Sequence, residues 1–350
     1  MIIFLIALAA LCCWGLEWKP RGIHDTYLSI EQTTAIRGIF ACIILFSHLR
    51  DYITLEGPAD ALFVRVIVFI GQCMVSVFFF YSGYGIVSSY RKKAHYQNGF
   101  LRKRLLVTWV HFACAVTAFA AVNLLMHIPC SGKSWLIALT GWDSIGNSNW
   151  YMFDTFALYL IVWLAMKAVS AALPQGSGEE KSRLLVCTCT ALVGVLILVL
   201  MRTRPSWWYD TLLCFALGGA YRLIQTPLDR FCGSGRCHAM LGIALFVLFL
   251  LFCTAGGAAA YNIRACLFVL LICWLTMKVR ISNPVLLWLG QHSFYIYIYM
   301  RIPMMAARRL GLFSGNKYLF SLAAMALTLA IAWGVRLFHR KTDPLFLTRP

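Results

Sequence analysis

The chain has 350 residues, of which 61% are hydrophobic and only 13% are charged, and its mean hydropathy is +0.75. A soluble globular domain is closer to half apolar and a quarter charged, so this composition excludes an ordinary soluble enzyme and indicates a membrane protein. The net charge of +18 would suggest nucleic acid for a soluble protein. In a membrane protein it is typical of basic cytoplasmic loops, so we expect no nucleic-acid partner.

Eleven apolar segments approach the length of about 20 residues that a membrane-spanning helix needs. In chain order they are 1–16, 34–52, 62–88, 104–127, 150–172, 184–201, 207–224, 239–256, 262–278, 285–302 and 318–338. Segments rich in glycine, proline and charge separate them, and none of these is long or polar enough to form a soluble domain. The sequence predicts an all-α, polytopic membrane bundle of about ten or eleven transmembrane helices that forms one domain over 1–350.

The first segment, 1–16, is apolar from its first residue. A cleavable secretory signal has a basic start before its short apolar core and is followed by a mature domain. Here the segment is one of many similar ones, so we interpret it as a retained, extra N-terminal helix outside a core of about 30–338.

The basic residues are distributed unevenly between alternate loops. With the first helix running from outside to inside, the cytoplasmic loops contain 20 of the 31 lysines and arginines and the outer loops contain nine. By the positive-inside rule, this predicts a multi-pass protein of the cell membrane with its N-terminus outside and its C-terminus in the cytoplasm.

The second segment contains an arginine and a histidine in "RGIFACIILFSHLRDY". His48 lies eleven residues after Arg37, which corresponds to about three helical turns and about 16 Å, so the two side chains share one helix face. Arg37 is expected at the cytoplasmic surface and His48 near the outer one. A neutral imidazole can take a proton from a hydroxyl, but His48 could equally mark the end of a helix in the headgroup region.

The loop between the third and fourth segments, "SSYRKKAHYQNGFLRKRL", has six basic residues. Such a loop can set the topology and bind anionic membrane lipid. The same residues can also dock the phosphates of a cytoplasmic donor through charge-assisted hydrogen bonds. Just before this loop, Ser82 and Gly83 are small enough to let a ligand or a second helix approach closely.

The outer loop and helix start "GWDSIGNSNWYMFDTF" combine aromatic and polar residues, among them Asn149, Trp150, Tyr151 and Asp154. Aromatic residues at this depth often form an interfacial belt. Mixed with amide and carboxylate groups, they also suit stacking on a sugar and hydrogen bonding to its hydroxyls.

Most of the 14 cysteines lie in apolar segments and are expected to be buried free thiols. Cys232 and Cys237 lie in a loop next to His238, but their spacing is not that of a standard zinc site and no second Cys/His cluster lies nearby. We therefore predict no metal.

Several motifs, in this order, resemble the membrane-bound acyltransferase-3 family. They are Arg37 and His48 with ten residues between them, "FFFYSGYGI" (78–86) and "FLRKRL" (100–105). Softer matches are "NWYMFDTFALYL" (149–160), "FALGGAYRLI" (215–224) and "LGQHSFYIYIYM" (289–300). Many relatives continue into a soluble hydrolase-like domain, which we do not expect here. Arg301 stands where relatives often have a histidine, so no role is predicted for it.

The resemblance implies an O-acyltransferase that uses acyl-coenzyme A, with acetyl-coenzyme A as the expected donor, and acylates an extracytoplasmic carbohydrate or cell-surface glycan precursor. It implies that His48 is the catalytic base. Unlike in many relatives, Arg50 and Asp51 follow closely, and Asp51, three residues after His48, could orient the imidazole or could equally lie in water. Arg37 and the basic residues Arg102, Lys103 and Arg104 would bind the coenzyme A phosphates, and Ser82 and Gly83 would line the acyl path.

Two other functions remain open at this stage. A secondary transporter or polysaccharide flippase would use Arg37 and His48 as ion or substrate contacts, although such proteins tend to show internal symmetry and paired broken helices, which this sequence lacks. A non-catalytic membrane partner or sensor would keep the helices without turnover. The acceptor, the acyl chain and the oligomeric state are not predicted.

Overall fold

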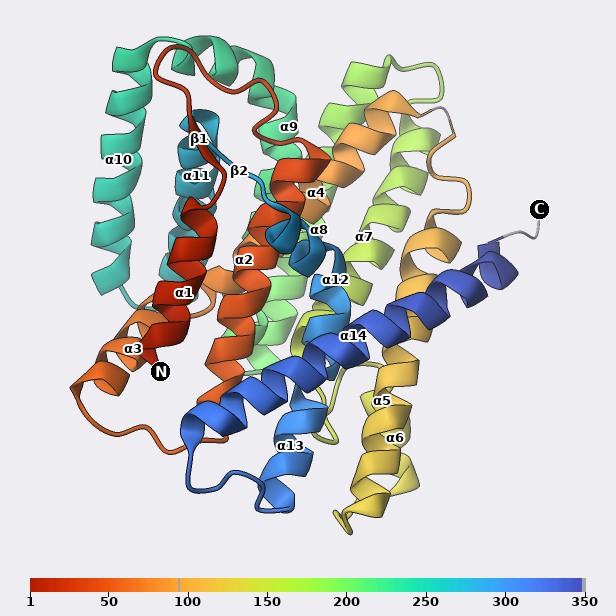
Figure 1. The fold of residues 1–350 in the computed structure, drawn as a ribbon. Coiled ribbons are helices and arrows are strands. Elements are labelled where there is room, and N and C mark those ends of the chain that lie inside the picture. The colour runs from red at the N-terminus through yellow and green to blue at the C-terminus, as the bar shows by residue number, and fades with distance from the viewer. Residues whose placement is uncertain (94, 348–350) are drawn as a thin grey trace.

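The computed structural model describes residues 1–93 and 95–347, and it is an all-α, polytopic membrane bundle (Figure 1). All eleven predicted segments coincide with helices. Within the described residues, eight helical segments are long and apolar enough to cross a membrane. Three predicted spans fall outside that group, namely α1 (Ile2–Cys13), α9 (Leu213–Cys232) and α12 (Pro284–Tyr299). The fold class predicted from the sequence is confirmed.

The first half begins with α2 (Ile30–Leu49), α3 (Pro58–Ile70) and α4 (Cys73–Lys92). The predicted 62–88 segment is broken at Gly71 and therefore forms parts of both α3 and α4. Gly71 has a φ of +48°, which side chains with a Cβ rarely adopt. A π-helical turn, η1 (Leu101–Leu106), leads into α5 (Val107–Leu125). The remaining elements of this half are α6 (Gly132–Ala138), α7 (Trp150–Ala172) and α8 (Gly178–Thr203).

The second half contains α10 (Gly235–Thr254), α11 (Ala258–Lys278), α13 (Arg301–Arg309) and α14 (Lys317–Leu347), with a short 3-10 turn, η2 (Ser206–Trp208), before α9. In Figure 1, α14 crosses the front of the bundle obliquely. The only strands in the described residues are β1 (Leu16–Trp18) and β2 (Val279–Ile281), which pair antiparallel. This pairing holds the segment that follows α1 against the segment that precedes α12.

Figure 1 shows the loops after α4, α7 and α9 together at one end of the bundle, which we call the basic end. The loops after α2, α5 and α13 lie at the other end, which we call the opposite end. This alternation matches the loop assignment made from the sequence. Which end faces the cytoplasm stays a prediction.

Two pairs of helices approach each other at glycines. A Cβ on Gly290 of α12 would lie 1.8 Å from the carbonyl oxygen of Thr34 in α2, and a Cβ on Gly83 of α4 would lie 2.0 Å from that of Phe215 in α9. Neither distance is possible for a real Cβ, so larger residues there would separate the helices. The close pairs α2–α12 and α4–α9 form two walls of the cavity described next.

Candidate active site

A cavity of about 750 Å³ lies between α2, α4, α7 and α12, with further lining residues from η1, α5 and α9. This volume is typical of small-molecule sites. The cavity is lined by a mixture of apolar side chains, hydroxyl groups and cations. Five tyrosines from three helices contribute to it: Tyr81, Tyr84, Tyr151, Tyr159 and Tyr297.

Five basic residues line the cavity: Arg37, Lys92, Lys93, Arg104 and Arg222. Four of them come from α2, α4 and α9 and one from η1. None makes an ion pair with a carboxylate among the residues that the structure describes. Cations that line a cavity without carboxylate partners provide a site for an anion.

Arg37 is held by its own helix. Its Nη2 donates to Oγ1 of Thr34 at 2.9 Å, and its Nε donates to the carbonyl oxygen of Thr33 at 3.4 Å. The hydroxyl groups of Tyr81 and Tyr151 act on it electrostatically. These neutral partners position the guanidinium group without neutralising its charge.

One face of α2 leads along the cavity to His48. Thr33, Arg37, Ala41 and Ile44 all line the cavity. The spacing of four, four and three residues places them on one helix face, and His48 follows Ile44 by one further turn. His48 therefore lies immediately beyond the deep end of the cavity.

The surroundings of His48 contain cations but no hydrogen-bonding partner. Across the described part of the chain, no hydrogen bond joins the His48 ring to another residue. The charges of Arg301 and Arg50 act on the ring. Arg301 is itself positioned by a hydrogen bond of 3.2 Å from its Nε to the hydroxyl oxygen of Tyr52. It lies one turn after Tyr297, which lines the cavity.

Asp51 is exposed. Its backbone N–H donates to the carbonyl oxygen of His48 at 3.1 Å, and its own carbonyl oxygen accepts from Arg308 at 2.7 Å. No hydrogen bond connects its carboxylate to the His48 ring within the described residues. The structure thus brings together the backbones of these two residues but not the side-chain groups named from the sequence.

The other donor-site residues named from the sequence divide into two groups. Arg104 and Ser82 line the cavity, whereas Arg102, Lys103 and Gly83 do not. Arg102 has an interaction of its own. Gly83 faces α9 and permits the close approach to Phe215.

The residues predicted to bind an acceptor also separate. Tyr151 lines the cavity, and its ring lies 5.3 Å from that of Tyr297. Asn149 precedes α7 as its N-cap, and the ring of Trp150 packs edge-on against Tyr151 at 6.1 Å. Asp154 is completely buried, and both its carboxylate oxygens lack a hydrogen-bond partner among the described residues.

Asp154 belongs to a group of buried polar side chains at the opposite end that have no well-formed hydrogen bond among the described residues. The others are Nδ2 of Asn147, Oγ of Ser148 and the hydroxyl group of Tyr297, and the last two interact with each other. Asp154 and Tyr297 also act on each other electrostatically. Buried polar groups are normally hydrogen-bonded, so this concentration indicates room for water or a polar ligand.

Sequence reasoning missed three residues of the site. Arg222 lies within a motif noted from the sequence but was not singled out, although it lines the cavity from the middle of α9. Tyr297 was not singled out because its segment, α12, is mostly apolar. Arg301, at the start of α13, was noted from the sequence, but no role was predicted for it. The alternation of tyrosines in "YIYIYM" is the signal that could have identified Tyr297.

One comparison with known proteins gives a match. A family model described as an acyltransferase domain matches residues 31–337, which is nearly the whole chain. No curated protein and no solved structure matches it. The chain therefore belongs to this acyltransferase family, and the resemblance stated from the sequence motifs is confirmed.

Proposed function

We propose that this membrane acyltransferase transfers an acetyl group, or another short acyl group, from cytoplasmic acyl-coenzyme A to a hydroxyl of an extracytoplasmic carbohydrate. The acceptor would be a cell-surface glycan or its precursor, and the membrane would be the cell membrane. The observation that carries the proposal is the cavity, because it begins among cations without carboxylate partners and ends one helical turn from His48.

The donor end of the cavity suits a phosphorylated carrier. Coenzyme A carries several phosphates, and arginine and lysine bind phosphate through charge-assisted hydrogen bonds. Lys92, the last residue of α4, and Lys93 after it line the cavity at the basic end, and Arg222 lines it from the middle of α9. The phosphates would bind there, and Arg37, further along α2, would meet the last of the donor's polar groups.

The middle of the cavity suits the thioester arm. Ala41, Ser82 and Phe79 line it with small or apolar surface. A lining of this kind would shield the thioester from water and position its carbonyl carbon near the end of the α2 stripe. The carbonyl carbon would then lie near His48.

The chemical step needs one base. His48 would take the proton from the acceptor hydroxyl while the hydroxyl oxygen bonds to the thioester carbonyl carbon. The carbon–sulfur bond then breaks, the coenzyme A thiolate leaves, and the imidazolium returns its proton to the sulfur. Arg301, whose charge acts on the His48 ring, is placed to stabilise the negative charge that develops on the carbonyl oxygen.

The acceptor would approach from the opposite end. Tyr151 and Tyr297 border the deep part of the cavity there, and Asp154 lies behind them with both carboxylate oxygens unpartnered in the described residues. A carboxylate and tyrosine hydroxyls suit hydrogen bonds to sugar hydroxyls. Asn149 and Trp150 lie beside this group and complete the proposed acceptor region.

The test measures covalent label transfer from acetyl-coenzyme A, labelled in its acetyl group, to surface glycan in membranes. His48→Asn keeps a polar side chain but removes the base, and we expect it to abolish transfer. His127→Asn is the matched control, because His127 is exposed in the loop after α5, at the same end. Transfer by His48→Asn at the rate of the parent protein would sink the proposal. Label that crosses the membrane without becoming covalently attached would instead indicate a transporter.

A further inference from the structure

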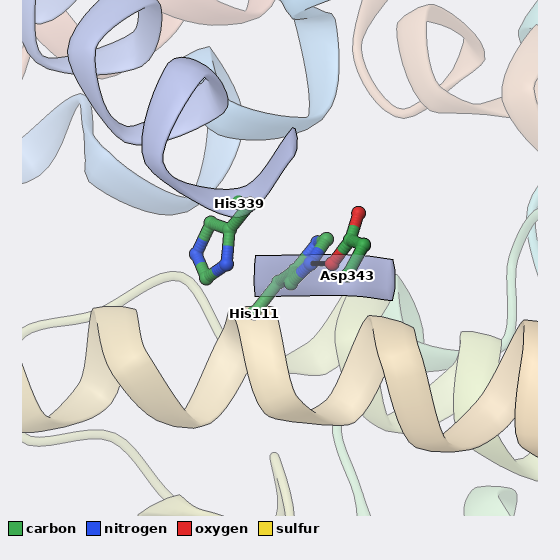
Figure 2. A group of neighbouring side chains, drawn as sticks. All are labelled: His111, His339 and Asp343. Atoms are coloured by element: carbon green, nitrogen blue, oxygen red, sulfur yellow. Dashed lines mark hydrogen bonds and ion pairs between the residues drawn. The ribbon is translucent and has the colours of Figure 1, made fainter. Parts of the chain in front are cut away.

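A second group of titratable side chains lies outside the proposed active site. His111 of α5 meets His339 and Asp343 of α14, and Figure 2 shows the three side chains turned toward one another. One ligand atom from each, a ring nitrogen from each histidine and a carboxylate oxygen, all lie within 4.8 Å of one another. His339 and Asp343 are four residues apart, so they project from the same face of α14.

This group is buried but only partly satisfied by hydrogen bonds. His111 is 6% exposed and His339 is 2% exposed. Nε2 of His111 lies 2.7 Å from Oδ1 of Asp343, and the two imidazole rings are 3.8 Å apart. Nε2 of His339 is buried without a partner among the described residues. A buried ring nitrogen with no partner is costly unless something binds it.

The second ring nitrogen of His111, Nδ1, also has a hydrogen-bonding partner. The hydroxyl group of Tyr295 lies 3.3 Å from Nδ1 of His111. Histidines that bind a metal through one ring nitrogen usually make a hydrogen bond with the other, which sets the tautomer and the ring orientation. Without an ion, Nε2 of His111 donates its proton to Oδ1 of Asp343. In the tautomer that instead donates Nδ1–H to the hydroxyl oxygen of Tyr295, Nε2 has a lone pair for a metal ion that would lie between it and Asp343.

We propose that His111, His339 and Asp343 bind one divalent transition-metal ion, of which zinc fits the ligand set. Two imidazole nitrogens and one carboxylate oxygen are common zinc ligands, with bonds of about 2.0–2.2 Å. Such bonds bring the ligand atoms to about 3.3 Å from one another in a tetrahedral site. Nε2 of His111 and Oδ1 of Asp343, which are 2.7 Å apart without an ion, would separate slightly, and ligand atoms that are up to 4.8 Å apart would move closer together around the ion. The side chain of Asp343 is 27% exposed, which leaves a path for a water as the fourth ligand.

The ion would connect α14 to α5 at the wall of the cavity. Thr108, one turn before His111 on α5, and Phe294 of α12 both line the cavity. The ring of Phe294 is 6.2 Å from that of His111. The metal therefore holds the last long helix against the wall and does not touch the reacting groups.

The test is the metal content of the full-length protein, purified in detergent without a polyhistidine tag. We expect one zinc per chain, and a melting temperature about 3 °C higher with zinc than after chelation, because an ion that binds only the folded state stabilises it. His339→Ala and Asp343→Asn should each reduce the bound zinc to below about one tenth per chain, in line with loss of one of three ligands.

The matched control is His238→Ala. His238 lies beside Cys237 and near Cys232, the Cys/His group for which the sequence predicts no metal. Its Nε2 is 3.1 Å from the carbonyl oxygen of Trp274. This variant should keep its zinc. The proposal is overturned if the parent protein neither retains zinc nor gains thermal stability from added zinc, or if Asp343→Asn keeps full occupancy. Because metal content is independent of transfer, failure here would leave the acyltransferase proposal intact.

Discussion

Two regions of the bundle contain histidines inside membrane helices, and their surroundings differ. His48 lies at the end of a cavity, within the electrostatic reach of Arg301 and Arg50, and its ring makes no hydrogen bond with another described residue. His111 does not line the cavity; its ring is tilted against that of His339, with centroids 3.8 Å apart, and lies 2.7 Å from the carboxylate of Asp343.

The difference shows that the neighbours of a histidine determine which chemistry suits it. A ring next to cations and an open cavity is suited to accept a proton from a substrate and return it, because no protein group competes for its nitrogens. A pair of rings with a carboxylate concentrates ligand atoms of the kind that bind a cation. Each of the following experiments changes one side of this comparison.

The largest effect is expected from His48→Asn. Loss of a general base should lower kcat by about 10²–10⁴-fold, while metal content and melting temperature stay those of the parent protein. Transfer of labelled acetyl groups, measured alongside zinc analysis, separates the two regions. Loss of zinc together with activity would show that the two histidine regions are not independent.

The next effect is expected from Arg37→Ala. Removing a charged hydrogen-bonding partner of the donor costs about 1.5–3 kcal/mol, which should raise the KM for acyl-coenzyme A by about 10–100-fold. Arg183→Ala is the control, because Arg183 is exposed near the basic end and paired with Glu179. If Arg37→Ala and Arg183→Ala have the same KM for acyl-coenzyme A, Arg37 does not contact the donor.

A third, smaller effect is expected from His339→Ala. Loss of the link between α14 and α5 should lower the melting temperature by about 2–6 °C and reduce transfer by no more than about tenfold, since His339 does not line the cavity. Differential scanning fluorimetry with and without a chelator measures the first quantity. A chelator should lower the melting temperature of the parent protein but not that of the variant.

The smallest effect is expected from Asp51→Asn. Asp51 is exposed, and no hydrogen bond connects its carboxylate to the His48 ring in the described residues. Surface substitutions of this kind usually change stability by less than about 0.5 kcal/mol, and we expect kcat within about twofold of the parent value. A loss as large as that of His48→Asn would restore Asp51 as the group that orients the ring.

Local patterns predicted much of the fold and part of the site. Apolar length identified the helices, and helical periodicity placed Arg37 and His48 on one face of α2. In the structure, Arg37 and the residues that follow it on this face, Ala41 and Ile44, line the cavity. The same reasoning left two roles open for Gly83, which faces α9 and does not line the cavity. A small residue permits either a ligand or a helix to approach, and only the neighbouring helix decides between them.

The sequence by itself determined the class of this protein, because apolar length, the uneven distribution of basic residues and the spacing of Arg37 and His48 are local properties of the chain. Only the tertiary structure decided which side chains meet. Arg222 joins Arg37 in the cavity because α4 and α9 pack closely at their glycines. His111 meets Asp343 across 232 positions of sequence. Such contacts depend on how helices far apart in the chain pack together, which the periodicity of one helix does not specify.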